Sequence, residues 1–163
     1  MISKTMQDAL NDQINAELFS WYLYLSMAAQ FETMNWKGMA HWMRIQAGEE
    51  MKHATKIYEF LFDRNGQVKL TALKGPKTAW ASPLEAFTEA LEHERMITSR
   101  IHALVEKSMK EKDFATQAFL QWFVTEQVEE ENSATYIVDR LNLIKDSPGG
   151  LGYFDHELGK RGA

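Results

Sequence analysis

Six side chains that could bind metal ions fall into two sets separated by one constant interval along this sequence. The sets are Glu17, Glu50 and His53, followed by Glu94, Gln127 and Glu130. Each set is a single carboxylate and then a pair at i, i+3, and Glu50-x-x-His53 is a complete Glu-x-x-His motif. Carboxylate and imidazole ligands without sulfur suit iron, manganese or zinc, whereas calcium sites rarely use histidine. Two metal ions bridged by carboxylates inside a helical bundle need this pattern.

Helices must position these side chains, and the apolar pattern predicts four long ones. Apolar residues recur at spacings of three and four in four segments: Met6 to Phe31, Gly38 to Phe62, Leu84 to Met109 and Phe114 to Ile144. At 3.6 residues per turn, the six candidate ligands lie on the inward, apolar stripes of these helices. Four of the six, one on each helix, fall near mid-helix. These four therefore meet in one layer whichever way each helix runs.

The connections between the four segments define the topology. The first and last connections are short, which makes the helices that they join antiparallel. Residues 66–81 form a connection long enough to run the length of a bundle. A short fifth helix is predicted from about Leu151 to Lys160. We therefore predict an all-α chain with a single domain over residues 1–163, built as a four-helix bundle with one long crossover.

Helix ends are indicated by local residue types. Ser82, followed by Pro83 and Glu85, predicts an N-cap with a capping box for the third helix. Asp113 predicts the N-cap of the fourth. Asn65-Gly66 predicts the end of the second helix, and Pro148-Gly149-Gly150 predicts the end of the fourth.

The predicted centre lacks charge compensation within the chain. Burying a carboxylate costs several kcal/mol unless it is paired. The inward stripes contain no lysine or arginine at the same level. The neutralising cations must then come from outside the chain, and this is the main sequence argument for a metal centre.

The composition argues against several other kinds of site and partner. The chain has no cysteine, which removes disulfides, thiolate metal sites and cysteine nucleophiles and fits a reducing compartment. A net charge of −5 argues against a polybasic surface for nucleic acid. The most apolar run, Leu18 to Ala29, is too short to span a bilayer, and the first residues do not form a secretory signal. We expect a cytoplasmic protein that binds neither nucleic acid nor membrane.

The first helix has a second apolar face. Phe19, Leu23 and Met27 lie opposite the Glu17 stripe, so the helix is apolar nearly all round. Such a helix is covered on both sides, whereas a bare four-helix bundle leaves its outer side in water. Self-association of the chain is the economical explanation.

An acidic run on the fourth helix allows two interpretations. Glu126, Glu129, Glu130 and Glu131 would ordinarily form a solvated helix face. Glu49, however, lies at the edge of the inward stripe of the second helix. The sharper interpretation is a third, looser cation site that leads away from the centre.

The sequence resembles the prokaryotic non-haem ferritins over essentially its whole length. The residues that carry the resemblance are Asn11-x-x-Ile14-Asn15-Ala16-Glu17, Glu49-Glu50-Met51-Lys52-His53-Ala54, Lys112-Asp113-Phe114 and Phe119-Leu120-Gln121-Trp122-Phe123-Val124-x-Glu126-Gln127-Val128-Glu129-Glu130-Glu131. The resemblance implies a ferritin-like four-helix bundle with a short fifth helix. It further implies a homo-oligomeric shell of 24 subunits that oxidises Fe(II) with O2 or H2O2 and stores ferric mineral inside.

The resemblance also implies roles for individual residues. Glu17, Glu50 and His53 resemble one iron site, and Glu50 would bridge to a second site made by Glu94 with either Gln127 or Glu130. Tyr24 resembles a tyrosine beside the di-iron centre and is the candidate catalytic residue. The third iron site of the family would consist of Glu49, Glu126, Glu129 and Glu130.

Three alternatives compete with this interpretation. Bacterioferritin binds haem through a methionine, and Met51 stands in the equivalent context, but the fourth helix has Gln127-x-x-Glu130 in place of a second Glu-x-x-His. No haem is therefore expected. Rubrerythrin-like peroxidases are disfavoured because their cysteine-rich iron module is absent. The remaining alternative is a structural bundle that holds zinc or another redox-inert ion and catalyses nothing.

Overall fold

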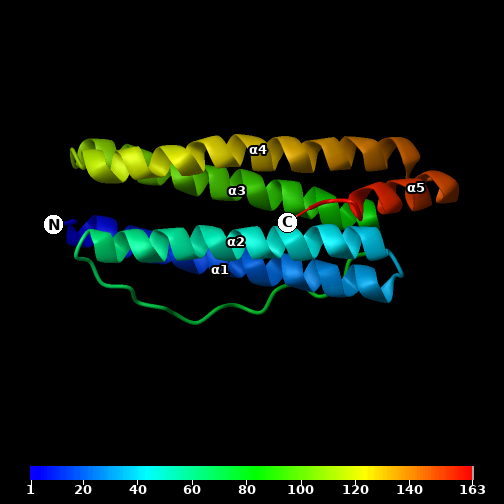
Figure 1. The fold of residues 1–163 in the computed structure, drawn as a ribbon, viewed down its shortest axis with the longest axis horizontal. Helices are drawn as coiled ribbons and strands as arrows, with labels where there is room; N and C mark the ends of the chain where they lie inside the picture. The colour runs from blue at the N-terminus through cyan, green and yellow to red at the C-terminus, as the bar shows by residue number, and fades with distance from the viewer. Residues whose placement is uncertain (163) are drawn as a thin grey trace.

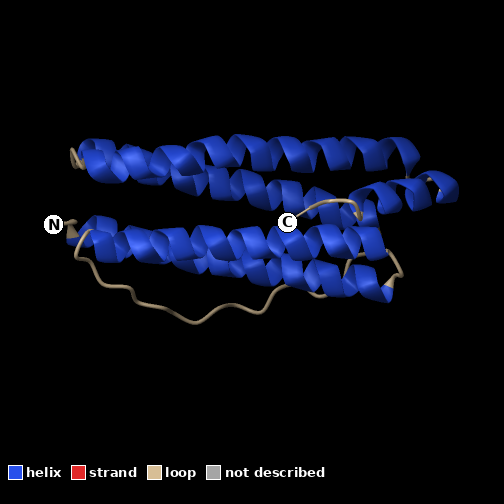
Figure 2. Ribbon diagram, in the orientation of Figure 1, coloured by secondary structure: helices blue, strands red, loops and turns tan. Residues whose placement is uncertain are grey.

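The computed structural model describes residues 1–162, and all regular structure in this range is helical (Figure 2). The helices are α1 (Lys4–Thr33), α2 (Lys37–Asp63), α3 (Pro83–Lys110), α4 (Phe114–Ile144) and α5 (Pro148–Leu158). The all-α prediction is confirmed, and the four long helices lie within three residues of their predicted bounds. Over residues 1–162, no helix combines the length and the apolarity that crossing a bilayer requires.

Two helical hairpins pack side by side to form the bundle. α1 and α2 form one antiparallel hairpin, and α3 and α4 form the other (Figure 1). The crossover, residues 64–82, runs along the outside of the bundle from the end of α2 to the start of α3 (Figure 1). α2 and α3 therefore run in the same direction. The predicted bundle with one long crossover is confirmed.

Polar side chains of α1 hold the crossover against the bundle. The Asn11 amide donates to the backbone carbonyl of Gln67, and its oxygen accepts from the backbone N–H of Lys69 at 2.7 Å. Further along α1, Asn15 donates to the Thr71 hydroxyl at 2.8 Å. These bonds satisfy backbone groups of a segment that has no secondary structure of its own. They also explain why two asparagines interrupt the apolar pattern of α1.

The predicted N-caps form. The Ser82 hydroxyl accepts from the backbone N–H of Glu85 at 3.1 Å, with Pro83 at the start of α3. The Glu85 carboxylate accepts from the backbone N–H of Ala81, one residue before the position that a capping box uses. Asp113 accepts from the backbone N–H of Thr116 at the start of α4.

α2 ends just before Asn65-Gly66, as predicted, whereas the boundary between α4 and α5 differs in detail from the expectation. At the end of α2, Asn65 rather than Gly66 adopts the left-handed backbone, with φ of 54°. Pro148 begins α5 instead of closing α4, because the Ser147 hydroxyl accepts from the backbone N–H of Gly150 and so caps α5. The fifth helix therefore starts three residues earlier than the predicted Leu151 and ends at Leu158 rather than Lys160.

The apolar core is divided into two clusters along the bundle. One cluster surrounds Phe31, Met43 and Phe87, towards the end where α5 packs. The other surrounds Leu10 and Ile101, towards the opposite end. Between the clusters lie the buried polar side chains near the middle of the four long helices, so apolar packing above and below holds a polar layer there: Glu17, Gln46, Glu50, His53, Glu94, Gln127 and Glu130.

The second apolar face of α1 is covered within the chain, contrary to the expectation. Leu23 is 4% exposed and Met27 is fully buried, in the same cluster as Trp80 of the crossover and Phe87 of α3, and Phe19, which is partly buried, packs against this cluster. Because the crossover and α3 cover this face, it gives no argument for self-association. Large apolar side chains are exposed elsewhere, including Tyr22, Tyr58 and Leu70.

Helix α5 docks where α2 begins, through a contact that only glycine permits. Trp36, the residue before α2, provides no side-chain cap, and Asp155 of α5 accepts from the backbone N–H of Met39 at 2.9 Å instead. A Cβ atom on Gly38 would lie 1.7 Å from the backbone oxygen of Asp155. The two helix backbones are therefore in direct contact.

Gly38→Ala is expected to displace α5 and to lower the free energy of unfolding by at least about 1–3 kcal/mol, the usual effect of overpacking. Thermal unfolding and limited proteolysis at the C-terminal end measure the two effects. Gly48→Ala is the matched control, because Gly48 is exposed on the same helix with no atom within 4 Å of a new Cβ. The control is expected to stabilise by up to about 1 kcal/mol. Equal melting temperatures for the two variants would contradict the prediction.

Candidate metal centre

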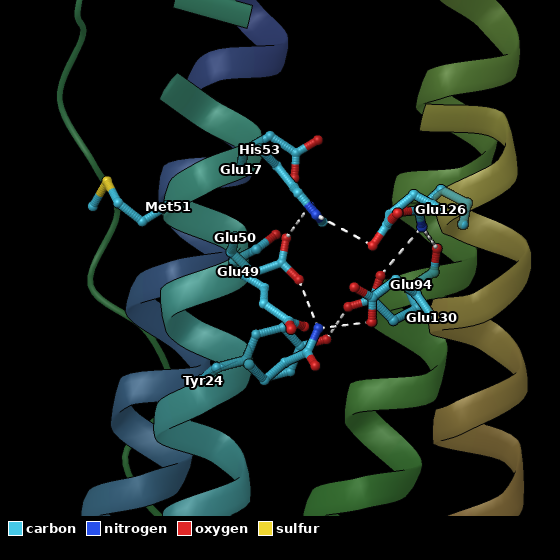
Figure 3. Close-up of polar contacts among 12 residues, drawn as sticks. Glu17, Tyr24, Glu49, Glu50, Met51, His53, Glu94, Glu126 and Glu130 are labelled. Atoms are coloured by element: carbon cyan, nitrogen blue, oxygen red, sulfur yellow. Dashed lines mark hydrogen bonds and ion pairs between the residues drawn. The ribbon is translucent and has the colours of Figure 1, made fainter. Parts of the chain in front are cut away.

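The polar layer brings carboxylates and one imidazole from all four long helices together (Figure 3). The side chains form three groups, and within each group one ligand atom of every residue lies within 4.8 Å of the others. The groups are Glu17, Glu50 and His53; Glu50, Glu94 and Glu130; and His53, Glu126 and Glu130. The first two groups are fully buried and share Glu50. This is the geometry of two adjacent metal sites with one bridging carboxylate.

The first group is held by α1 and α2. Gln13, one turn before Glu17 on α1, donates to one oxygen of Glu17 at 2.8 Å. The other oxygen of Glu17 is buried and has no hydrogen-bond partner. A buried carboxylate oxygen without a partner is costly, and a cation held by Glu17, Glu50 and His53 would supply the missing partner.

The His53 imidazole is fixed between ligands and aromatic rings. Nδ1 lies 3.1 Å from the Glu50 carboxylate, and Nε2 lies 3.9 Å from Glu126 on α4. The rings of Trp122 and Phe123 meet the imidazole edge to face, at centroid distances of 5.5 and 6.0 Å. The ring therefore has little freedom to rotate away from the centre.

The second group is held mainly by α3 and α4. The Tyr24 hydroxyl of α1 donates to one oxygen of Glu94, and the Gln127 amide donates to the other at 3.2 Å. Gln127 also donates to the Thr98 hydroxyl at 3.2 Å. The amide nitrogen of Gln127 is thus directed at Glu94. Glu130, by contrast, presents a carboxylate oxygen to both Glu50 and Glu94.

Burial raises the pKa values of these carboxyl groups. Desolvation is the largest cause in each case, and it raises the pKa of Glu17 to about 8, that of Glu94 to about 7 and that of Glu130 to about 8. Desolvation also raises the pKa of Glu50, with repulsion from Glu94 and Glu130 adding to it. The carboxyl groups therefore retain protons at neutral pH until a cation replaces them.

The sequence predicted that no lysine or arginine would neutralise the carboxylates of the centre, and this holds for the side chains that contact these carboxylates directly. Within residues 1–162, no lysine or arginine lies within ion-pair distance of the two buried ligand groups. Two arginines that the apolar pattern did not indicate lie at the edge of the centre, where each donates to a glutamine beside a candidate ligand. Arg100 donates to the Gln13 oxygen at 3.0 Å, and Arg161 donates to the Gln46 oxygen at 3.0 Å.

The structure separates the residues that the resemblance assigned to a third iron site. Glu126 and Glu130 lie with His53, at the side of the centre nearest α4. Glu49 instead forms an ion pair with Arg161 at 2.7 Å, and Glu129 is exposed. The four glutamates therefore do not form one ligand group in this structure.

Met51 lies outside the centre. Its side chain points away from the carboxylates, towards the crossover (Figure 3). There it lines an apolar groove with Leu18, Tyr58 and Leu70. Met51 therefore contributes nothing to the ligand groups of the bundle centre.

The glutamines next to the ligands are the functional residues most easily missed in the sequence. Neither Gln13 nor Gln46 is among the six candidate ligands of the sequence. The available signal is spacing, because each glutamine precedes a glutamate ligand by four residues, Gln13 before Glu17 and Gln46 before Glu50. Residues at i and i+4 face each other along a helix.

Tyr24→Phe is expected to weaken metal binding at the Glu94 side roughly tenfold, the lower end of the effect of losing a partner that orients a metal ligand. The phenol is fully buried and donates to Glu94, so phenylalanine removes the donor while keeping the ring. Titration calorimetry with Zn(II) measures the affinity. Tyr22→Phe, on the exposed side of the same helix, is the control. Wild-type affinity in Tyr24→Phe would show that the phenol does not orient Glu94.

Comparison with known proteins identifies the family of this chain. Residues 7–144 match the family described as the ferritin-like domain. The chain belongs to the ferritin family. It is 44% identical over 161 residues to the bacterial non-heme ferritin of Bacteroides fragilis. The aligned residues cover 99% of this chain and 100% of that protein. The resemblance indicated by the sequence motifs is thereby confirmed.

Two further ferritins show the same relation. The bacterial non-heme ferritin of Staphylococcus aureus is 38% identical, over 99% of this chain and 97% of its own length. Among solved structures, an open pore ferritin from the hyperthermophilic archaeon Archaeoglobus fulgidus is 52% identical and superposes with a TM-score of 0.99. That comparison covers 99% of this chain and 100% of the archaeal ferritin.

Proposed function

We propose that this ferritin oxidises Fe(II) at the buried centre and stores the ferric product inside a shell formed by many copies of the chain. The observation that supports oxidation at a paired site is the position of Glu50, which belongs to both buried ligand groups. Fe(II) is then the substrate, with Glu17, Glu50 and His53 holding one ion and Glu50, Glu94 and Glu130 holding its neighbour. We infer that Glu130 completes the second site, because Gln127 directs its amide nitrogen at Glu94.

The carboxylates favour oxidation through their charge. Fe(II) entry displaces protons from carboxyl groups whose pKa values are raised by burial. The resulting anionic ligands stabilise Fe(III) more than Fe(II), because the attraction grows with the charge of the ion. Each Fe(II) gives up one electron, and O2 takes two electrons and two protons to form H2O2. With H2O2 as oxidant, two electrons and two protons yield two water molecules.

The centre is asymmetric in a way that favours turnover. The first site contains an imidazole and two carboxylates, whereas the second contains three carboxylates and no imidazole. Glu130 also belongs to the outer group with His53 and Glu126. An oxidised ion can therefore pass from the second site towards Glu126 without leaving carboxylate ligands. We propose this side as the exit route.

Assembly into a shell of 24 subunits is the second part of the proposal. Support comes from the family and from apolar surface that this chain leaves exposed. Tyr58 and Leu70 are 40% and 66% exposed, and they line the groove that also contains Leu18 and Met51. Such a groove is a typical contact surface between subunits. Size-exclusion chromatography that shows only monomers or dimers in physiological salt would contradict the shell.

Iron loading separates the proposed store from a structural metal site. The purified protein would be titrated with Fe(II) without oxygen, then exposed to O2, and the iron retained per chain would be counted after gel filtration. A store is expected to retain many iron ions per chain, and the near-ultraviolet absorbance of the ferric product should rise with loading. Retention of only two ions per chain would indicate a structural bundle. A Soret band in the purified protein would indicate haem.

A further inference from the structure

The residues after α5 return to the metal centre. The chain leaves α5 at Leu158 and turns back along the bundle (Figure 1), so that Arg161 lies beside α2. His41 of α2 lies 2.8 Å from the backbone carbonyl of Arg161. The Arg161 guanidinium packs 4.4 Å from the centre of the Trp42 ring. These contacts fix Arg161 at the edge of the polar layer.

The Arg161 guanidinium binds two groups next to the ligands. One nitrogen donates to the Glu49 carboxylate at 2.7 Å, and the other donates to the Gln46 side-chain oxygen at 3.0 Å. A planar guanidinium is suited to two such bonds, because its donors point in fixed directions. Arg161 is thereby a cation held against the centre by the chain itself.

Gln46 transmits this contact to both hairpins. Its amide nitrogen donates to Glu50 at 2.9 Å and to Glu130 at 2.8 Å, and its side chain is 1% exposed. Both donors of the amide are used, and its oxygen is used by Arg161. If the amide were reversed, its oxygen would face two carboxylates and both hydrogen bonds would be lost. Arg161 therefore fixes the orientation in which Gln46 holds Glu50 and Glu130.

We propose that Arg161 is a positioning residue that orients Gln46 towards Glu50 and Glu130 and keeps Glu49 from binding a metal ion. It does not touch the substrate. A third ion near His53, Glu126 and Glu130 would therefore lack the Glu49 carboxylate and bind weakly, because the guanidinium already pairs with Glu49. The segment after α5 thus controls both the affinity and the capacity of the centre.

Zn(II) titration calorimetry of the assembled protein tests both parts, since Zn(II) binds without redox chemistry. Arg161→Gln is expected to weaken binding at the Glu50–Glu130 side roughly tenfold, as loss of an outer partner does. It is also expected to raise the stoichiometry from two to three ions per chain. Arg161→Lys should keep two ions, because the ammonium still neutralises Glu49, but should weaken binding because it lacks the planar fork. Lys160→Gln is the matched control, since Lys160 is exposed and pairs with Glu157.

The double variant Arg161→Gln with Glu49→Gln identifies the additional ligand, because it should return the stoichiometry to two. Wild-type affinity and stoichiometry in Arg161→Gln would overturn the inference. If that variant does not fold, as judged by circular dichroism, Arg161→Lys decides: unchanged Zn(II) affinity would show that the guanidinium does not orient Gln46.

The inference rests on the proposed binding of iron at this centre. The Zn(II) measurement distinguishes a failure of the role of Arg161 from a failure of the proposed function. A wild-type protein that binds Zn(II) at two sites but does not oxidise Fe(II) contradicts the proposed function and leaves the role of Arg161 to be judged by the variants. A wild-type protein that binds no Zn(II) contradicts the role of Arg161.

Discussion

Replacing Glu50 and His53 together by alanine is expected to lower the initial rate of aerobic Fe(II) oxidation by more than about 100-fold. Loss of an outer partner alone costs roughly 10–100-fold in metal affinity or activity, and these two residues would contact the ions directly. Glu50 belongs to both buried ligand groups, so its removal affects both sites. His53 supplies the imidazole of the first site. Stopped-flow absorbance of the ferric product measures the rate.

The control for this experiment is Glu59→Gln, which removes a carboxylate from the exposed side of the same helix. It should oxidise Fe(II) at the wild-type rate. A single Glu50→Gln substitution keeps the side-chain volume and is expected to give most of the loss, because an amide supplies no bridging charge. An initial rate within twofold of wild type in the double alanine variant would show that oxidation takes place elsewhere.

The metal-free protein is expected to become less stable as the pH rises from about 5 to about 8, by several kcal/mol in its free energy of unfolding. Glu17, Glu94 and Glu130 have ordinary pKa values of 4.5 when exposed, and burial raises them to about 8, 7 and 8. The folded state therefore binds more protons than the unfolded state between these limits. The stability that these bound protons contribute is fully present below the ordinary pKa of 4.5 and is lost as the pH rises through the raised pKa values of about 7 to 8.

Metal binding should reverse this dependence. At pH about 8, Glu94 has lost most of its proton and Glu17 and Glu130 about half of theirs, so Zn(II) has fewer protons to displace than at pH about 5, where all three carboxyl groups carry protons. The increase in melting temperature on adding Zn(II) is therefore expected to be larger at the higher pH. Glu17→Gln should flatten the pH dependence of the metal-free protein, because it removes one titrating group. A metal-free melting temperature that rises over this pH range would contradict the assigned burial of charge.

The candidate ligands that meet at the centre could be found in the sequence because their signal is local and periodic. Glu17, Glu50 and Glu94 interrupt apolar stripes near the middle of long helices, and a helix converts such spacing directly into a common direction. The residues around these glutamates also indicated the ferritin family, which the comparisons confirm. The long helices and the crossover followed from the same periodicity and from the length of residues 66–81.

The remaining features depend on contacts between distant segments, which periodicity does not contain. Arg161 lies more than a hundred residues from Glu49 and Gln46 along the chain, and only the return of the segment after α5 brings them together. The interpretation of Phe19, Leu23 and Met27 was wrong for the same reason: the crossover has no periodic pattern, so Trp80 could not be placed in the cluster that buries Leu23 and Met27. Side-chain bonds such as those of Asn11 to the crossover likewise require the fold.

The sharing of ligands between the two hairpins has a consequence for the connectivity of the folded chain. The group of Glu50, Glu94 and Glu130 joins one hairpin to the other. A cation bound there links segments far apart in sequence, as a disulfide would, and so restricts the conformations open to the unfolding chain. The chain contains no cysteine. A bound ion is therefore a reversible cross-link, formed when iron arrives and removed when it leaves.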